Sequence, residues 1–186
     1  MIRTLPLLAV SALALSACAD DAPQGEATPA AETDMVAEAP AQTATATLTG
    51  PDGAEMGTAT AREENGVLMI SVNAMGLTPG AHGAHIHTTG DCSASDFTSA
   101  GGHWNPEDVN HGIQSEQPNP HAGDLSNIEV SEDGTGTLEG ESTGTFEGLF
   151  DADGSAFVIH AEPDDYKTQP SGDAGDRVAC GVFERG

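Results

Sequence analysis

The sequence predicts an all-β protein, an eight-stranded Greek-key barrel or sandwich with two long functional loops. Short alternating or β-branched runs recur between turn motifs, and no segment has a convincing helical period of 3.6 residues. Aromatic residues make up only 4% of the chain and glycines number 23, which indicates short strands, many turns and a core of Val, Ile, Leu and Phe. These features are typical of sandwiches and Greek-key barrels.

The expected strands begin at Thr43. Turn motifs such as Glu64-Asn65-Gly66 and Asp133-Gly134 separate several of them. Two segments without periodicity, 89–123 and 162–176, are either disordered or functional, since simple connections are shorter. The first contains Cys, His, Trp, Gly and Pro, which is typical of a loop organised by metal. The expected strands are 43–49, 56–62, 67–73, 83–88, 124–131, 135–139, 155–161 and 178–184, with a strand fragment at 145–150.

The N-terminal segment 1–17 resembles a bacterial lipoprotein signal peptide. Arg3 precedes an apolar run from Leu5 to Leu15, which is too short to span a bilayer. The small residues before Cys18 resemble a lipobox, whose cysteine becomes the lipidated N-terminus. The alternative is an ordinary signal peptide cleaved after Ala19. Both interpretations export the protein to an oxidising compartment. The lipobox favours a lipid anchor on the periplasmic side of the bacterial envelope. Ala19 rather than Asp follows Cys18, which resembles the sorting signal of outer-membrane lipoproteins and favours that membrane.

Residues 18–42 are expected to form a disordered acidic tether rich in Ala, Pro and Thr. This segment contains six acidic residues and no basic residue, and it has almost no large apolar side chain to bury. The whole chain is acidic too, with a formal net charge of −25. This charge argues against nucleic acid and anionic membrane surfaces as partners, which leaves the N-terminal lipid as the expected membrane attachment.

The candidate chemistry lies in the histidines. His85 and His87 are two residues apart on an expected strand, so both point to the same face and can share one metal ion. An isolated pair of this kind is more often solvated or part of the core, but this pair is followed by further candidate ligands. They are His103, His111, His121 and Asp124, which form a His3Asp set suited to tetrahedral zinc, and His160 late on another strand.

The chain resembles the copper,zinc superoxide dismutases over roughly residues 43–186, which is the predicted enzyme domain. The matching motifs are HGAHIH (82–87), GDC (90–92), SAGGHWNP (99–106), HG (111–112), HAGDLSNI (121–128), VIHAEPDDY (158–166), QPSG (169–172) and GDRVACGV (175–182). The resemblance implies disproportionation of superoxide to dioxygen and hydrogen peroxide, with one copper and one zinc per subunit. It implies copper on His85, His87, His103 and His160, and zinc on His103, His111, His121 and Asp124.

The resemblance also assigns roles to individual residues. It implies that His103 bridges both metals as an imidazolate and carries a proton during catalysis, and that His82 packs without ligating. Arg177 is the implied catalytic arginine that attracts the anion, although a structural ion pair is the alternative. Asp164 is the implied carboxylate that orients His85 and His111, the alternative being a surface acid. Cys92 and Cys180 match the disulfide of the family.

Two other classes of protein remain as alternatives. One is a non-catalytic copper- and zinc-binding module on the same fold. The other is an adhesive β-sandwich on a lipid anchor, whose histidines only hold zinc. Homodimers are common in the family, and the sequence leaves the choice between monomer and homodimer open.

Overall fold

The structure is a computed structural model that describes residues 42–113 and 120–186. These residues contain ten strands and two short 3₁₀ helices, joined by turns and two long loops. The predicted signal peptide, Cys18 and nearly all of the tether lie outside the described residues. Within the described residues, no helix has the length and apolarity to cross a membrane. The strands are β1 (Thr43–Thr49), β2 (Glu55–Glu64), β3 (Val67–Ala74), β4 (Gly80–His82), β5 (Ala84–His87), β6 (Ile128–Val130), β7 (Gly136–Ser142), β8 (Ala156–His160), β9 (Arg177–Val182) and β10 (Glu184–Arg185), and the 3₁₀ helices are η1 (Thr98–Ala100) and η2 (Glu147–Phe150).

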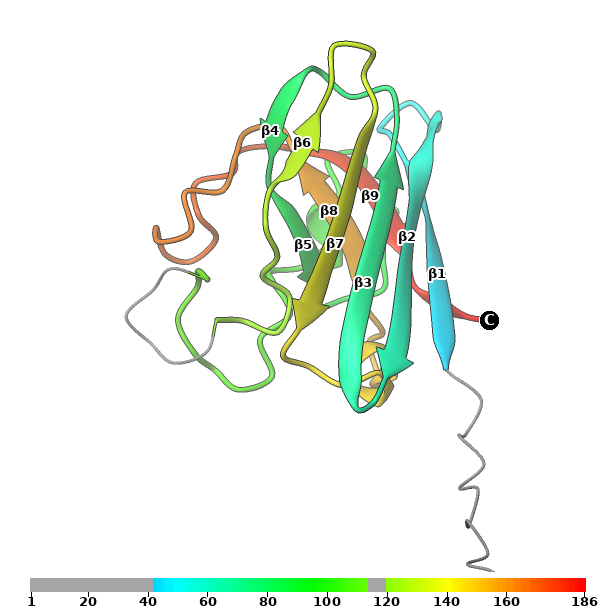
Figure 1. The fold of residues 1–186 in the computed structure, drawn as a ribbon, viewed down its shortest axis with the longest axis vertical. Coiled ribbons are helices and arrows are strands. Elements are labelled where there is room, and N and C mark those ends of the chain that lie inside the picture. Colours follow the sequence, from blue (N-terminus) through cyan, green and yellow to red (C-terminus); the bar gives the residue numbers. More distant parts are fainter. Residues whose placement is uncertain (1–41, 114–119) are drawn as a thin grey trace, which may run out of the picture. The chain divides into compact units, whose positions relative to one another are not determined.

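The strands form one antiparallel sheet that curls into a nearly closed barrel (Figure 1). The strand order is β4-β6-β7-β3-β2-β1-β9-β8-β5, and β10 pairs with β1. Strands β1, β2 and β3 are sequential neighbours, whereas β3 next pairs with β7 and β1 with β9, as in a Greek key. The two ends of the order, β4 and β5, are separated in the chain by Gly83 alone. The predicted all-β barrel is confirmed.

The barrel interior is filled by alternate residues of each strand. In β1, Ala44, Ala46 and Leu48 are fully buried while the first three threonines are exposed. Side chains from β3, β5 and β8 complete this core, and burying each Leu or Ile contributes roughly 1.5–3 kcal/mol. Strands β5 and β8 are buried on both faces, because the long loops cover their outer face. The candidate site lies on that covered outer face.

The predicted strand 83–88 corresponds to β5, and the structure adds the short strand β4 directly before it. Gly83 separates β4, which pairs with β6, from β5, which pairs with β8. The Gly83 amide donates to Glu162 and its carbonyl accepts from His160. A Cβ atom at Gly83 would lie only 2.9 Å from the Cβ of Ala174. The break therefore lets the second long loop approach the barrel, and it is one reason for ten strands where eight were expected.

Three other predicted segments differ from the structure. Of the expected strand 124–131 only Ile128–Val130 forms a strand, because Asp124 makes just an isolated bridge to β5 and the Asn127 amide donates to Tyr166 of the second long loop. The fragment 145–150 is not a strand, since its amides bond back over three residues and form η2. The last expected strand ends at Val182, and β10 follows separately. There Arg185 pairs with Glu147 of η2 at 2.7 Å and lies over two phenylalanine rings.

Candidate metal centre

Six histidines and one aspartate form two buried groups of potential metal donors that share His103. Within each group the donor atoms lie within 4.8 Å of one another. The structure therefore brings together all the residues that the sequence predicted as ligands. The first group is His85, His87, His103 and His160, and the second is His103, His111, His121 and Asp124.

Strand register places three of these imidazoles on one face. Across β5 and β8, His85 pairs with Val158 and His87 pairs with Ala156. Directly paired residues project to the same side of a sheet. His160 is two residues beyond Val158, so its side chain emerges on that side as well. The alternation of the two strands thus fixes three of the four donors in the first group.

The remaining donors reach this face because the first long loop bonds to β5. Isolated antiparallel bridges pair His87 with His103 and His85 with Asp124. Between them, the Trp104 amide donates to the Ile86 carbonyl at 2.8 Å, and the Ile86 amide donates to the Gly123 carbonyl at 2.9 Å. The loop therefore continues the sheet locally, and the backbone sets the position of its ligands.

The second group converges on one carboxylate oxygen. Asp124 Oδ1 lies 2.8 Å from His103 Nδ1, 2.9 Å from His111 Nδ1 and 3.3 Å from His121 Nδ1. Asp124 Oδ2 accepts from the backbone amides of Gly112 and His121, which fixes the carboxylate. Zinc bonds of about 2 Å place tetrahedral ligand atoms about 3.3 Å apart. Three nitrogens and one oxygen at these separations fit a zinc ion.

The first group is held by its outer ring nitrogens. His85 Nε2 lies 2.8 Å from Asp164 Oδ2, His87 Nδ1 lies 2.9 Å from the Gly101 carbonyl oxygen, and His160 Nδ1 lies 3.3 Å from the Gly175 carbonyl oxygen. Such contacts fix the tautomer and orientation of a ligating imidazole.

Two inner ring nitrogens of this first group lack protein partners, and the other two face only each other. His85 Nδ1 and His103 Nε2 are buried without any hydrogen bond. Nε2 of His87 and Nε2 of His160 lie 3.3 Å apart. Buried polar atoms without partners are costly, so they call for a group that the polypeptide does not provide. A second metal ion that prefers imidazole, such as copper, fits this donor set.

The protonation of these imidazoles suits metal binding. Burial lowers the pKa of His103 to about 4 and that of His160 to about 3. Burial also lowers the pKa of His87 well below its usual value. Neighbouring imidazoles reinforce each shift, because adjacent positive charges would repel. All three rings are therefore neutral at pH 7, with lone pairs available for a metal.

At His111 and Asp124, hydrogen bonds outweigh burial and set the direction of the pKa shift. Burial alone would lower the pKa of His111, but hydrogen bonds to Asp124 and Asp164 raise it to about 9. Burial alone would raise the pKa of Asp124, yet hydrogen bonds from three histidines hold it far below its usual value. This half of the site therefore holds a proton at pH 7 that a metal ion must displace.

A cavity of about 400 Å³ opens onto the first donor group, and Arg177 lies at its side. His87, His103 and His160 line it on one side, and Pro170, Ser171 and Gly175 of the second long loop line it on another. The Arg177 guanidinium donates to the Phe97 carbonyl at 2.5 Å and to the Gly101 carbonyl at 2.6 Å. Burial lowers the pKa of Arg177, but an arginine remains charged in a protein. The cavity thus joins a fixed cation to three imidazoles.

Comparison with known proteins agrees with this geometry. The profile of the copper/zinc superoxide dismutase family (SODC) matches residues 55–183. This chain belongs to that family. The superoxide dismutase [Cu-Zn] of Caulobacter vibrioides is 44% identical over 149 residues, which cover 76% of this chain and 85% of the relative.

Solved structures of the family share the fold. A double mutant of an SOD-like protein from Bacillus subtilis matches with a TM-score of 0.68 and 38% identity, over 74% of this chain and 95% of that one. Cu/Zn superoxide dismutase from Brucella abortus matches with a TM-score of 0.64 and 29% identity, over 76% and 99%. Members of this family use copper and zinc, which are the two metals that the donor groups fit.

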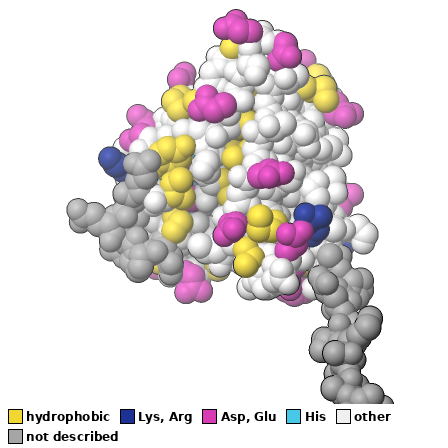
Figure 2. Space-filling view, viewed as in Figure 1, with side chains coloured by type: hydrophobic (Ala, Val, Ile, Leu, Met, Phe, Trp, Pro, Cys, Tyr) yellow, Lys and Arg dark blue, Asp and Glu magenta, His cyan; other side chains and the backbone are white. Residues whose placement is uncertain are grey.

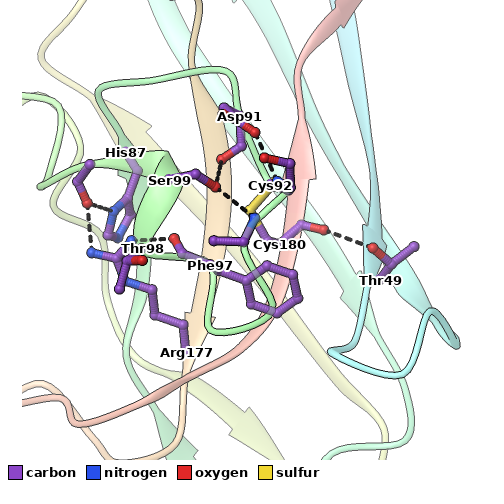
Figure 3. Close-up of a disulfide and its surroundings, with 12 residues drawn as sticks. Thr49, His87, Asp91, Cys92, Phe97, Thr98, Ser99, Arg177 and Cys180 are labelled. Atoms are coloured by element: carbon purple, nitrogen blue, oxygen red, sulfur yellow. Dashed lines mark hydrogen bonds between the residues drawn. A yellow bond between two sulfur atoms is a disulfide. The ribbon is translucent and has the colours of Figure 1, made fainter.

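The disulfide that the family resemblance implied is confirmed. Cys92 and Cys180 are bonded, with Cα atoms 5.8 Å apart. Figure 3 shows the bond joining β9 to the loop segment that carries Phe97 and Ser99. Phe97 packs with both cysteines in a small apolar cluster on the outer face of β8. The disulfide therefore fastens the segment whose carbonyl groups hold Arg177 to the strand on which Arg177 lies.

The structure also places two further residues to which the resemblance assigned roles. His82 is buried outside both donor groups, with its ring nitrogens 2.7 Å from the His160 carbonyl and 2.8 Å from the Thr78 carbonyl. Asp164 is buried and contacts one histidine of each donor group through different oxygens, His85 at 2.8 Å and His111 at 3.0 Å. The alternative that Asp164 is a surface acid is excluded by its burial.

Other residues of the site were not predicted. Asn127 accepts from the Asp164 amide and donates to the Asp164 carbonyl, so it holds the backbone of Asp164 in place. Gln169 contacts both backbone groups of His111. Both lie within motifs shared with the family, but a side chain that bonds to a remote backbone leaves no spacing pattern in the sequence.

Proposed function

We propose that this protein disproportionates two superoxide ions and two protons to dioxygen and hydrogen peroxide at a copper centre joined to zinc through His103. One observation carries the proposal. Two buried donor groups share the His103 imidazole. In the first group, His103 Nε2 and His85 Nδ1 have no protein partner. This group faces a cavity that Arg177 also lines.

The donor sets assign the metals to residues. His85, His87, His103 and His160 would hold copper, and His103, His111, His121 and Asp124 would hold zinc. When bound, copper supplies alternating one-electron oxidation and reduction of superoxide. The pure imidazole set suits copper, whereas the mixed imidazole and carboxylate set suits zinc.

His103 is positioned to manage a proton. Its Nδ1 is fixed against Asp124 Oδ1 at 2.8 Å, while its buried Nε2 has no protein partner, and the residue lines the cavity. Nε2 can therefore hold a proton and release it toward a small anion in the cavity. Because Nδ1 remains anchored, the ring stays in place while Nε2 changes its partner.

Arg177 attracts and orients the anionic substrate. Two of the five N–H groups of the guanidinium bond to the Phe97 and Gly101 carbonyl groups, which leaves three for a ligand. The surface is otherwise acidic, and Figure 2 shows Asp and Glu side chains spread over one face with sparse Lys and Arg. A local positive site is therefore needed to counter the overall negative charge.

Pulse radiolysis of the copper- and zinc-loaded protein tests this function. We expect rapid decay of superoxide, lost in His160→Ala. Arg177→Met should lower the rate about tenfold and flatten its dependence on ionic strength. The matched control is Lys167→Met, which removes a positive charge that does not line the cavity. Slow decay despite stoichiometric copper and zinc would instead indicate a non-catalytic metal-binding module.

We further propose export, with a lipid at Cys18 that anchors the protein to the outer membrane. The signal-like segment 1–17 supports this proposal, and the Cys92–Cys180 disulfide is compatible with an oxidising compartment. Mass spectrometry of the purified N-terminus and membrane fractionation test it. Cys18→Ser should release the protein from the membrane, whereas an unmodified N-terminus following Ala19 would support simple secretion. Sedimentation of the released protein decides between monomer and homodimer.

A further inference from the structure

The second long loop encloses His111 on several sides. Asp164 Oδ1 lies 3.0 Å from His111 Nε2. A Cβ atom at Gly172 would lie only 2.7 Å from the same nitrogen, so the loop backbone rests against the ring. A Cβ atom at Gly112 would overlap the Tyr166 carbonyl oxygen, which places the two loops in backbone contact. We call residues 164–172 the clasp.

Gln169 is the member of the clasp that holds the backbone of His111. Its Oε1 accepts from the His111 amide at 2.9 Å, and its Nε2 donates to the His111 carbonyl at 2.9 Å. One carboxamide thus provides the acceptor and the donor that a neighbouring β-strand would provide. His111 lies outside every strand, so its backbone groups depend on such a partner.

The clasp itself forms part of the wall of the cavity. Pro170 and Ser171 follow Gln169 and line the cavity beside His87 and Arg177. The turn is closed by the Gly172 amide, which donates to the Thr168 carbonyl at 2.7 Å. The residue that fixes His111 is therefore bonded covalently to the residues that shape the access route to the other donor group.

We propose that Gln169 is a positioning residue, which aligns His111 for zinc and makes the cavity wall at Pro170 and Ser171 depend on zinc occupancy. A zinc ion held by the second donor group would restrain the His111 ring, and Gln169 would transmit that restraint from both backbone groups of His111 to Pro170 and Ser171. The inference rests on the proposed function in one respect, the assignment of His111 to zinc.

Zinc affinity and hydrogen exchange of the purified protein test this role. Zinc binding is measured by competition with a chromophoric chelator in wild type, Gln169→Met and Lys167→Met. The two variants place the same side chain in the same exposed loop, but only the first removes the bonds to His111. We expect Gln169→Met to weaken zinc binding by about 10–100-fold, as loss of groups that orient metal ligands does, and Lys167→Met to match wild type. Gln169→Glu keeps the size and the acceptor but loses the donor. Its zinc affinity should therefore lie between those of Gln169→Met and wild type.

Hydrogen exchange gives a second readout that a purely structural role would not change. Adding zinc to the wild type should slow exchange of the amides at 171–175, and this slowing should be absent in Gln169→Met. Thermal unfolding of the metal-free variants shows whether the barrel is intact.

Each outcome has one meaning. Equal zinc affinity in Gln169→Met and wild type overturns the inference, as does zinc-dependent slowing that persists in Gln169→Met. Absence of zinc binding in the wild type would overturn the assignment of His111, and with it the proposed function.

Discussion

Reduction of the Cys92–Cys180 disulfide should remove a large part of the stability of the metal-free protein. The bond spans 88 residues of sequence. In the chain-entropy treatment, opening a loop of that length lowers the free energy of unfolding by about 4.6 kcal/mol at 25 °C. A domain of this size has roughly 5–15 kcal/mol in total, so the reduced protein should lie close to its unfolding threshold.

Guanidinium unfolding with and without a phosphine reductant measures this difference. Copper and zinc are removed by a chelator in both arms, because bound metals would add stability of their own. The matched control is the double variant Cys92→Ala/Cys180→Ala, which should resemble the reduced protein and be insensitive to reductant. A change of less than about 1 kcal/mol on reduction would show that the unfolded chain is already restricted, and it would refute the entropic argument.

Three further predictions concern the metal centre and the core. Zinc binding should release about one proton at pH 7, and zinc affinity should rise with pH up to about 9, because zinc displaces the Nδ1 proton of His111, whose pKa is raised to about 9. Calorimetry in two buffers of different ionisation enthalpy measures the proton, and binding without proton release would contradict the assignment. Asp164→Asn leaves one acceptor oxygen for two imidazoles, so affinity for both metals should fall about 10–100-fold in chelator competition, and unchanged affinities would argue against an orienting role. Gly144→Ala drives a methyl group into the Trp104 ring and should lower the free energy of unfolding by about 1–3 kcal/mol, whereas Gly102→Ala, with nothing within 4 Å, should leave it unchanged.

Local patterns predicted the part of the site that lies on strands. Alternation alone placed His85 and His87 on one face, and the structure places His160 beside them through the register of β5 and β8. The ligands on the first long loop have no periodicity, and the sequence grouped them only by residue type and by resemblance to a family. Their geometry depends on backbone bonds between that loop and β5, which a single sequence does not encode locally.

The errors in the predicted fold have the same origin. The short strand β4 was not predicted, and it is separated from β5 because Glu162 and His160, which lie far along the chain, take the backbone bonds of Gly83. The composition of residues 145–150 is typical of a strand fragment. In the structure η2 forms there, and its Glu147 pairs with Arg185 near the C-terminus. Gln169 was not predicted because its partner is 58 residues away and is a backbone rather than a side chain.

A single carbonyl oxygen, that of Gly101, serves two functional groups at once. It accepts from His87 Nδ1 at 2.9 Å and from Arg177 at 2.6 Å. A substitution that shifts this peptide alters the electron donation of one imidazole and the placement of the guanidinium together. Redox tuning and anion capture are thus coupled traits in this protein, and compensating mutations for one are expected to be found among residues that govern the other.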